Sequence, residues 1–343
     1  MAAGAVGFWA ARVALAPPDD PLADAGEAVT YEVVVQTLGQ SLRFTAVAEW
    51  QTVPLGRAWA DGVVTAVEVG AGDTVEPGQI LFRVDQRPVV IASGSVPAFR
   101  DLEAGAIGAD VAQLEALLKV LGVLEEEPND TFDEATSLAV RAWQRSLEMP
   151  DDGIVRQGDV LYTPQLPVRV VPTEALAVGA PLAGGEVVIN RLATQPDVLV
   201  PLTLEQRSLV PLTGTVFLTY PRGTWEAIIA RAEETDEQGL ERLNLVLVAP
   251  DGGPVCGDTC PEWISAMGRT NFPADIVVTP EMTGPVVPVA AIVTDAGGGH
   301  AVELADGTSV PVEVLVSTGG LAVVSGVKAG DVVVLPAGDP SGQ

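Results

Sequence analysis

Basic residues are scarce in this sequence. Lys and Arg together number 18 against 46 Asp and Glu, which gives a formal net charge of −28, and the only lysines are Lys119 and Lys328. This balance argues against nucleic acid as a partner, because neutralising phosphates needs clustered Lys and Arg. It also disfavours adsorption on an anionic membrane surface. Two explanations of the charge stay open, namely solubility through self-repulsion and attraction of cationic substrates.

Cysteine and histidine are almost absent as well. The two cysteines, Cys256 and Cys260, stand in the run VCGDTCPEW, and His300 is the only histidine. A close cysteine pair with an intervening glycine predicts a small-loop disulfide and an oxidising compartment. Metal binding is the alternative, but a four-ligand zinc site would need further soft ligands. We therefore expect a disulfide and no metal site or cofactor.

The sequence also gives little support for catalysis. A catalytic triad would have to use His300, which we interpret as a loop residue, and there is no G-x-S-x-G motif. Carboxylate pairs such as Asp151-Asp152 flank turns, where aspartate caps backbone groups. A pair of catalytic carboxylates is the alternative that sequence alone leaves open. We expect the protein not to be an enzyme.

Val, Ala and Gly are plentiful, and the pattern of apolar residues around Gly62–Asp85 is typical of β structure. This stretch has the sequence GVVTAVEVGAGDTVEPGQILFRVD. Apolar and polar residues alternate up to Val69, which is typical of a half-buried strand. Gly70 to Asp73 then predicts a tight reversal. Pro77 and Gly78 occupy the central positions of a type II turn. The stretch therefore predicts a compact hairpin unit of two short strands.

The same skeleton of an apolar residue, a glycine turn and a following strand recurs three times, at Val155–Leu161, Leu182–Val188 and Val327–Val333. A glycine-turned strand unit used several times favours a modular β protein over a single enzyme core. Tyr31–Trp50 is expected to form two strands around Gly39, which lead into the central hairpin.

The central stretch resembles one half of a biotinyl/lipoyl-type domain. Carrier domains of that type need a lysine at a hairpin tip, and Lys119 and Lys328 lie elsewhere. The remaining resemblance is to the cofactor-free lipoyl-like domain of membrane fusion proteins, also called periplasmic adaptor subunits. The structural turn residues that this resemblance implies are Gly62, Gly72, Asp73, Pro77 and Gly78. The other residues that carry the likeness are Val64, Val67, Val69, Val75, Gln79, Leu81 and Val84.

The pattern changes to helical at about Phe99. One helix is expected to begin near Asp110 and to end at Gly122, and a second begins near Asp133 and ends before Pro150. The apolar stripes recur at intervals of three and four residues. The first stripe contains Val111, Leu114, Leu117, Leu118 and Leu121, and the second contains Thr136, Val140, Trp143 and Leu147.

This helix pair resembles the peptidoglycan-binding domain of wall-targeted proteins. The residues that carry the likeness are Gly105, Gly108, Asp110, Val111, Leu114, Leu118, Phe132, Asp133, Thr136, Ala139, Val140, Trp143, Gln144 and Asp152-Gly153. The resemblance implies Arg141, Gln144 and Trp143 as candidate contacts to peptidoglycan. Two alternatives stay open: Trp143 is a core residue, and Arg141 and Gln144 lie on a solvated face. The β pattern from Ile154 to Thr163 replaces the third short helix that is usual in the family.

The expected fold is mainly β and multidomain, with a split lipoyl-like β-sandwich, a small β-barrel, a membrane-proximal β domain and an inserted α-helical module. The apolar run Ala2–Ala16 is interpreted as the outer end of a membrane anchor, with a frayed terminus as the alternative. The expected domains are 1–28 (anchor remnant and linker), 29–97 (first half of the membrane-proximal and lipoyl-like region), 98–156 (helical module), 157–196 (second lipoyl-like half), 197–282 (barrel), 283–338 (membrane-proximal domain) and 339–343 (tail).

The resemblance implies an extracytoplasmic adaptor of an efflux or export system, anchored in the cytoplasmic membrane and tethered to the cell wall. The implied partners are an inner-membrane transporter (a permease with its ATPase, most simply of the ABC type), peptidoglycan, and further copies of the chain in a ring. No long heptad run is present, so a coiled-coil reach across a wide periplasm is not expected. A wall-binding structural or signalling protein without a transport role is the alternative.

Overall fold

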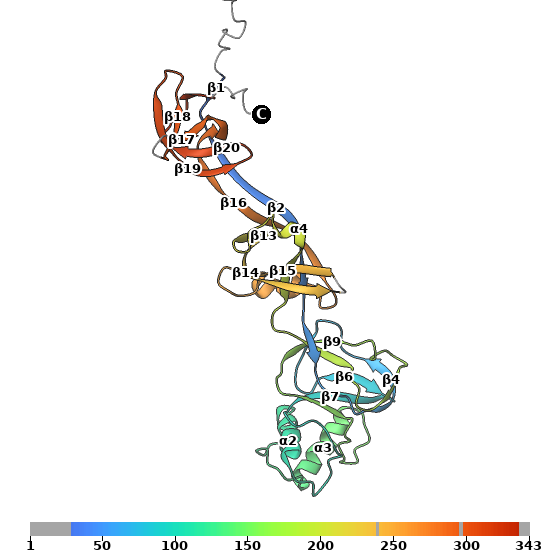
Figure 1. Ribbon diagram of the computed structural model, residues 1–343. Coiled ribbons are helices and arrows are strands. Elements are labelled where there is room, and N and C mark those ends of the chain that lie inside the picture. Colours follow the sequence, from blue (N-terminus) through green and yellow to red (C-terminus); the bar gives the residue numbers. More distant parts are fainter. Residues whose placement is uncertain (1–28, 238–239, 295–297, 336–343) are drawn as a thin grey trace, which may run out of the picture. The chain divides into compact units, whose positions relative to one another are not determined.

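The computed structural model describes residues 29–237, 240–294 and 298–335 (Figure 1). The expected membrane-anchor remnant at 1–28 and the tail at 339–343 lie outside these residues. The chain divides into two compact units, one from the first strands to Leu42 together with Val277 onward, the other from Arg43 to Ile276. In the described part of the chain, no helix has both the length and the apolar character needed to cross a bilayer.

A closed barrel of six strands lies in the Arg43–Ile276 unit. The strands pair in the order β13, β14, β15, β12, β2 and β16, and β13 pairs with β16 to complete the ring. Closure leaves no unpaired strand edge, as expected for this composition. The predicted small barrel is thus confirmed. Its strands are β2 (Val34–Glu49), β12 (Asp197–Thr203), β13 (Thr215–Tyr220), β14 (Gly223–Glu237), β15 (Leu240–Val248) and β16 (Thr270–Pro288).

Strand β2 corrects the prediction of two strands around Gly39. It runs from Val34 to Glu49 without a turn. A Cβ on Gly39 would lie 2.7 Å from the Cγ and 3.0 Å from the Cα of Glu281. Glycine is therefore needed here for the close approach of another segment, a role that looks the same as a turn signal in a sequence.

The C-terminal unit also contains the first strand of the described residues. β1 (Thr30–Glu32) pairs with β21 (Val332–Val334), and Val33 joins the valine-rich core of this unit. The expected range 29–97 combined the first part of the membrane-proximal region with the first part of the lipoyl-like region. The other strands of the unit are β17 (Ile292–Thr294), β18 (His300–Glu303), β19 (Ser309–Thr318) and β20 (Leu321–Ser325).

Two local predictions fall in this unit. The turn at Asp306-Gly307 connects β18 to β19, and Gly307 adopts a φ of 83°, as a hairpin signal requires. His300 is exposed, but it is the first residue of β18 and pairs with Thr294 and Val312, so the interpretation as a loop residue is wrong.

A β-sandwich is assembled from the two segments that flank residues 98–156. Its five-stranded sheet has the order β10-β4-β6-β7-β8, and its four-stranded sheet has the order β3-β11-β9-β5. Strands from before and after the helical module lie side by side in both sheets. The strands are β3 (Thr52–Pro54), β4 (Asp61–Val67), β5 (Thr74–Val75), β6 (Ile80–Val84), β7 (Arg87–Ser93), β8 (Val160–Thr163), β9 (Val168–Pro172), β10 (Pro181–Ala183) and β11 (Ile189–Leu192).

Strand β7 is buried on both faces. Val89 and Ile91 point into the core between the two sheets, whereas Val90 and Ala92 belong to a second core with the helices. A strand covered on both sides reads as a continuous apolar run, and VVIA is such a run. The helices α2 (Ala109–Val120) and α3 (Glu134–Ser146) thus form a third layer on the five-stranded sheet, beside β7 in Figure 1.

The recurring skeleton has one physical basis in all four copies. The residue after the turn glycine accepts a hydrogen bond from the backbone N–H three residues before it, which closes the turn. These side-chain acceptors and backbone donors are Gln79 with Glu76 (3.3 Å), Asp159 with Arg156 (2.7 Å), Glu186 with Ala183 (2.8 Å) and Asp331 with Lys328 (2.8 Å). The repeat is therefore a turn motif, used in the sandwich and again in the C-terminal unit.

The expected turn residues of the central stretch lie in tight surroundings. Gly62 has a φ of 137° and stands against the Asp85 carboxylate, and Gly72 has a φ of 93°. The Asp73 carboxylate accepts from the Gly70 N–H at 2.7 Å, which closes the first turn. Gly78, next to Pro77, has a φ of 89°, and a Cβ on it would collide with the side chain of Leu121 of the helical module.

Gly158 offers a direct test of how closely the turn before β8 approaches the loop before β4. A Cβ there would lie 2.6 Å from the Cα and 2.8 Å from the N of Ala60, which are backbone atoms that cannot turn aside. We expect Gly158→Ala to lower the free energy of unfolding by about 1–3 kcal/mol in urea titrations. Gly70→Ala is the control, because the nearest atom would be at an ordinary 3.4 Å, and it should change stability by less than about 0.5 kcal/mol. Equal losses of stability in the two variants would contradict the close packing of Gly158 against Ala60.

The cysteine loop joins β15 to β16. These strands are not neighbours in the barrel, so the loop passes across one barrel end. It contains a 3₁₀ turn (Gly257–Thr259) and the short helix α5 (Cys260–Trp263). Cys256 and Cys260 are buried and form the predicted disulfide, with an S–S distance of 2.03 Å. No group of His, Cys, Asp and Glu in the described residues is arranged to hold a metal ion.

Candidate functional site

The two helices of the inserted module begin and end close to the predicted residues. Asp133 caps α3 by accepting from the Thr136 N–H at 3.0 Å. Asp110, in the first turn of α2, is buried and makes a two-bond ion pair with Arg100, with N–O distances of 2.7 and 2.9 Å. Helix α2 is followed by Gly122, which has a φ of 72°. The sequence therefore places the helices correctly, while the ion pair of Asp110 adds a role that the helix dipole alone did not indicate.

Two of the three candidate peptidoglycan contacts are inside the module. Trp143 is 2% exposed and packs in the core that the helices share with β7 and β8. Gln144 is 0% exposed, so the alternative of a solvated face is wrong for this residue. The stripe is wider than the helical spacing suggested, because the loop after α3 folds back over Gln144. Only Arg141 of the three reaches solvent.

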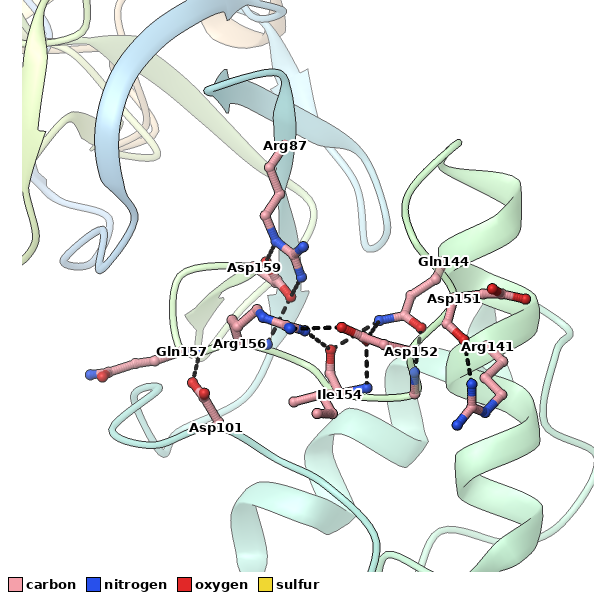
Figure 2. Close-up of polar contacts among 11 residues, drawn as sticks. Arg87, Asp101, Arg141, Gln144, Asp151, Asp152, Ile154, Arg156, Gln157 and Asp159 are labelled. Atoms are coloured by element: carbon pink, nitrogen blue, oxygen red, sulfur yellow. Dashed lines mark hydrogen bonds and ion pairs between the residues drawn. The ribbon is translucent and has the colours of Figure 1, made fainter.

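Gln144 holds that returning loop in place (Figure 2). Its side-chain amide donates to Oδ1 of Asp152 and to the Ile154 carbonyl, each at 2.9 Å, and its oxygen accepts from the Gly153 N–H at 2.9 Å. Asp152 also accepts from the Ile154 N–H at 3.0 Å. Buried polar groups that are satisfied in this way fix one conformation. Gln144 and Asp152-Gly153, which carry part of the likeness to the peptidoglycan-binding family, therefore hold the fold of the module together.

Arg141 lies over the same loop. Its guanidinium donates to the Asp151 carbonyl, and a Cβ on Gly153 would lie 3.0 Å from its Nε. Gly153 has a φ of 78°, so glycine is needed there both for its backbone conformation and for the approach of Arg141. Arg141 remains a candidate for polar contacts on the module surface.

Glu115 is a buried carboxylate that sequence reasoning missed. It is 1% exposed on α2, accepts from the Asn129 N–H at 2.6 Å and accepts from the hydroxyl of Thr136 on α3. It therefore ties both helices to the loop between them. Helical spacing could have found it, because position 115 follows Leu114 and lies three residues before Leu118 on the buried side.

A chain of charged side chains joins the module to the sandwich (Figure 2). Asp152 pairs with Arg156 at 2.6 Å, and Asp159 pairs with Arg87 of β7 through two hydrogen bonds, one of 2.5 Å. Asp159 also accepts from the backbone N–H of Arg156, and the Asp159 side chain is only 3% exposed. The acidic turn after the module is thus anchored on the first residue of the neighbouring strand.

Four aspartates of the module have pKa values that are shifted toward the charged form. The hydrogen bond from Arg156 holds the pKa of Asp152 far below its usual range, and the bond from Arg100 lowers the pKa of Asp110. The pKa values of Asp133 and Asp151 are also lowered, chiefly by the Thr136 N–H and by Arg145. A carboxylate with a depressed folded-state pKa stabilises the fold above its ordinary pKa, and this contribution is lost as pH falls through the folded value.

The lowered pKa of Asp152 predicts how the stability loss caused by Asp152→Asn depends on pH. At neutral pH the variant should lose about 1 kcal/mol of stability, because Arg156 loses a partly exposed ionic partner. The difference from the parent should shrink as pH is lowered below about 4, because the Asp152 carboxylate of the unfolded parent chain begins to take up a proton there. Urea unfolding between pH 3 and 7 measures it, with Asp258→Asn as a control for the loss of one negative charge. A difference that grows toward low pH would contradict the assignment.

A groove lies where the module meets the sandwich. Its volume is about 690 Å³, and its walls come from the loop before β4, the β6–β7 hairpin, the end of α3 and the turn before β8. The indole of Trp59, which is 40% exposed, stands on the sandwich side. The groove therefore exists only because the module is inserted at this point of the sandwich.

One protein-family model matches the chain. It is described as "Putative peptidoglycan binding domain" and covers residues 107–155, which contain both helices and the loop that Gln144 holds. The predicted resemblance of the module is thereby confirmed at the level of the family. No curated protein sequence matches the chain.

Several solved structures are similar to the chain at low identity. ZneB from Cupriavidus metallidurans is 16% identical with a TM-score of 0.30, and the match covers 95% of this chain and 97% of that one. MacA from Actinobacillus actinomycetemcomitans is 14% identical with a TM-score of 0.42, covering 90% and 100%. The membrane fusion protein Spr0693 from Streptococcus pneumoniae R6 is 13% identical with a TM-score of 0.27, covering 68% and 98%.

Proposed function

We propose that this protein is an extracytoplasmic adaptor, or membrane fusion, subunit of an efflux or export system, and that its helical module binds peptidoglycan. One observation carries the proposal: a module that matches a peptidoglycan-binding family is built into a sandwich whose two halves come from either side of it. In the adaptor family that the sequence resembles, this point of insertion holds a helical hairpin. Here the same position holds a wall-binding type of module.

The size of the module supports a short-range tether. Its helices have 12 and 13 residues, so each is about 20 Å long. Helices of this length do not extend far from the sandwich that they cover. On this view the adaptor is anchored at the cytoplasmic membrane, works with a permease and ATPase of the ABC type, assembles as a ring of identical copies, and contacts the wall close to that membrane.

Sedimentation with purified cell-wall sacculi tests the wall contact. The full chain should co-sediment with sacculi and should stay in the supernatant when sacculi are left out. If the intact chain does not sediment with sacculi, the tether is refuted.

Co-purification tests the transport role separately. The tagged full chain, expressed with the permease encoded beside it, should retain that permease through detergent extraction. A chain that binds sacculi but retains no permease would favour the alternative, a wall-binding structural or signalling protein. The family match to a peptidoglycan-binding domain is the observation that supports this alternative.

A further inference from the structure

The groove between the module and the sandwich has the dimensions of a ligand site. Small-molecule sites in proteins commonly have volumes of roughly 300–1,000 Å³, and this groove has about 690 Å³. Its module side is formed by Glu148, Met149 and Pro150, which directly follow α3, and by Arg156 and Gln157. The segment that matches the peptidoglycan-binding family therefore forms one wall of the groove.

The opposite wall presents an exposed aromatic ring. Trp59 is the most exposed of the tryptophans in the described part of the chain, whereas Trp50 and Trp143 are almost fully buried. Its ring lies over Gly185, where a Cβ would come within 3.5 Å of the indole. An exposed and supported indole offers a flat apolar face for a sugar ring and an electron-rich face for a cation.

The charge of the groove is negative after its internal ion pairs are subtracted. Arg87 is paired with Asp159, and Arg156 is paired with Asp152. Four lining carboxylates form no salt bridge with a described basic side chain, and they come from both walls; one of them, Asp101, accepts from the Gln157 N–H and lies in the field of Arg156. These are Asp61, Asp85, Asp101 and Glu148. An occupant with a positive group is therefore favoured over an anion.

We infer that this groove binds a peptidoglycan stem peptide that carries a free side-chain amine, with the adjoining sugar against Trp59. The inference rests on the proposed wall-binding function and adds the chemistry of the ligand. The amine lies between Glu148 of the module and Asp101, while the sugar face stacks on the indole. The sandwich thus contributes half of the wall-binding site.

Calorimetric titration of the full chain with two soluble disaccharide–peptides tests this. One carries the free amine, and the other is identical but N-acetylated there. The parent chain should bind the free-amine ligand roughly tenfold more tightly. Trp59→Ala should weaken both ligands by a similar factor. Glu148→Gln combined with Asp101→Asn should remove the discrimination, whereas Glu205→Gln on the exposed helix α4 (Leu204–Arg207) should leave it unchanged.

The outcomes separate this inference from the proposed function. If the parent chain binds sacculi but the groove variants bind both ligands as the parent does, the groove is not the site, and the tether stands. A parent chain that sediments with sacculi but binds neither soluble ligand overturns the inference in the same way. If the parent binds neither sacculi nor ligands, the tether and the inference both fail, and permease co-purification still tests the adaptor role. Thermal unfolding confirms that each variant is folded.

Discussion

Replacing residues 98–156 by a flexible linker of about 12 residues is expected to destabilise the sandwich severely. Strands β7 and β8 are parallel neighbours, so the linker would have to return along the length of a strand. More importantly, it would uncover Val90, Ala92 and Val160, which are buried against the helices. Each exposed valine costs about 1.5–3 kcal/mol, against a total stability of about 5–15 kcal/mol.

Urea unfolding and size-exclusion chromatography measure this effect. The linker variant should aggregate or unfold at a much lower urea concentration than the parent. Adding Val90→Thr and Val160→Thr to the linker variant should restore solubility, because the uncovered face becomes more polar. A linker variant that is monomeric and as stable as the parent would show that the module is an independent domain on a tether.

Asp159→Ala is the second change with a large expected effect. The Asp159 side chain is 3% exposed, and its removal leaves the Arg87 guanidinium and the Arg156 N–H without their acceptor. Breaking a buried pair from one side is strongly destabilising. Because Arg87 is 30% exposed, water compensates for part of the loss, and we expect a loss of about 2–3 kcal/mol.

A matched pair on the surface provides the control. Arg207 and Glu234 form a salt bridge at 2.9 Å with side chains 46% and 70% exposed, so Glu234→Ala should cost less than about 1 kcal/mol. A double-mutant cycle of Arg87→Ala and Asp159→Ala gives the coupling energy of the buried pair. A coupling no larger than that of the surface pair would mean that the charge chain does not join the module to the sandwich.

Much of the architecture could be predicted because it leaves strong local signals. The helical stripes containing Leu114 and Val140 and the Asp133 cap mark the module, and the glycine turns mark the strand units. The pairing of Cys256 with Cys260 followed from their spacing. In each case the residues that decide the structure are close together in the sequence.

The errors have a common physical cause, which is that distant segments decide them. Gly39 was expected in a turn, but the reason for its glycine is Glu281, far along the chain. The partner of residues 30–32 is likewise distant, because β21 comes from the last part of the described chain. A solvated face was open as an alternative for Gln144 because the loop that covers it is not part of the helical period. The junction groove could not be predicted, because its walls come from segments that only folding brings together.

The central claim is that the sandwich is one body assembled from segments on either side of the helical module. Strands β4 and β10 belong to different segments, and Asp61 pairs with Ala183 in their register. In Asp61→Cys combined with Ala183→Cys, the two cysteines should form a disulfide spontaneously, because directly opposed strand residues meet its geometric limits. Asp61→Cys with Pro181→Cys, two residues out of register, is the control. Mass spectrometry of the oxidised proteins should find the new cross-link in the first variant and not in the second. Free thiols at both positions of the first variant would contradict the claim.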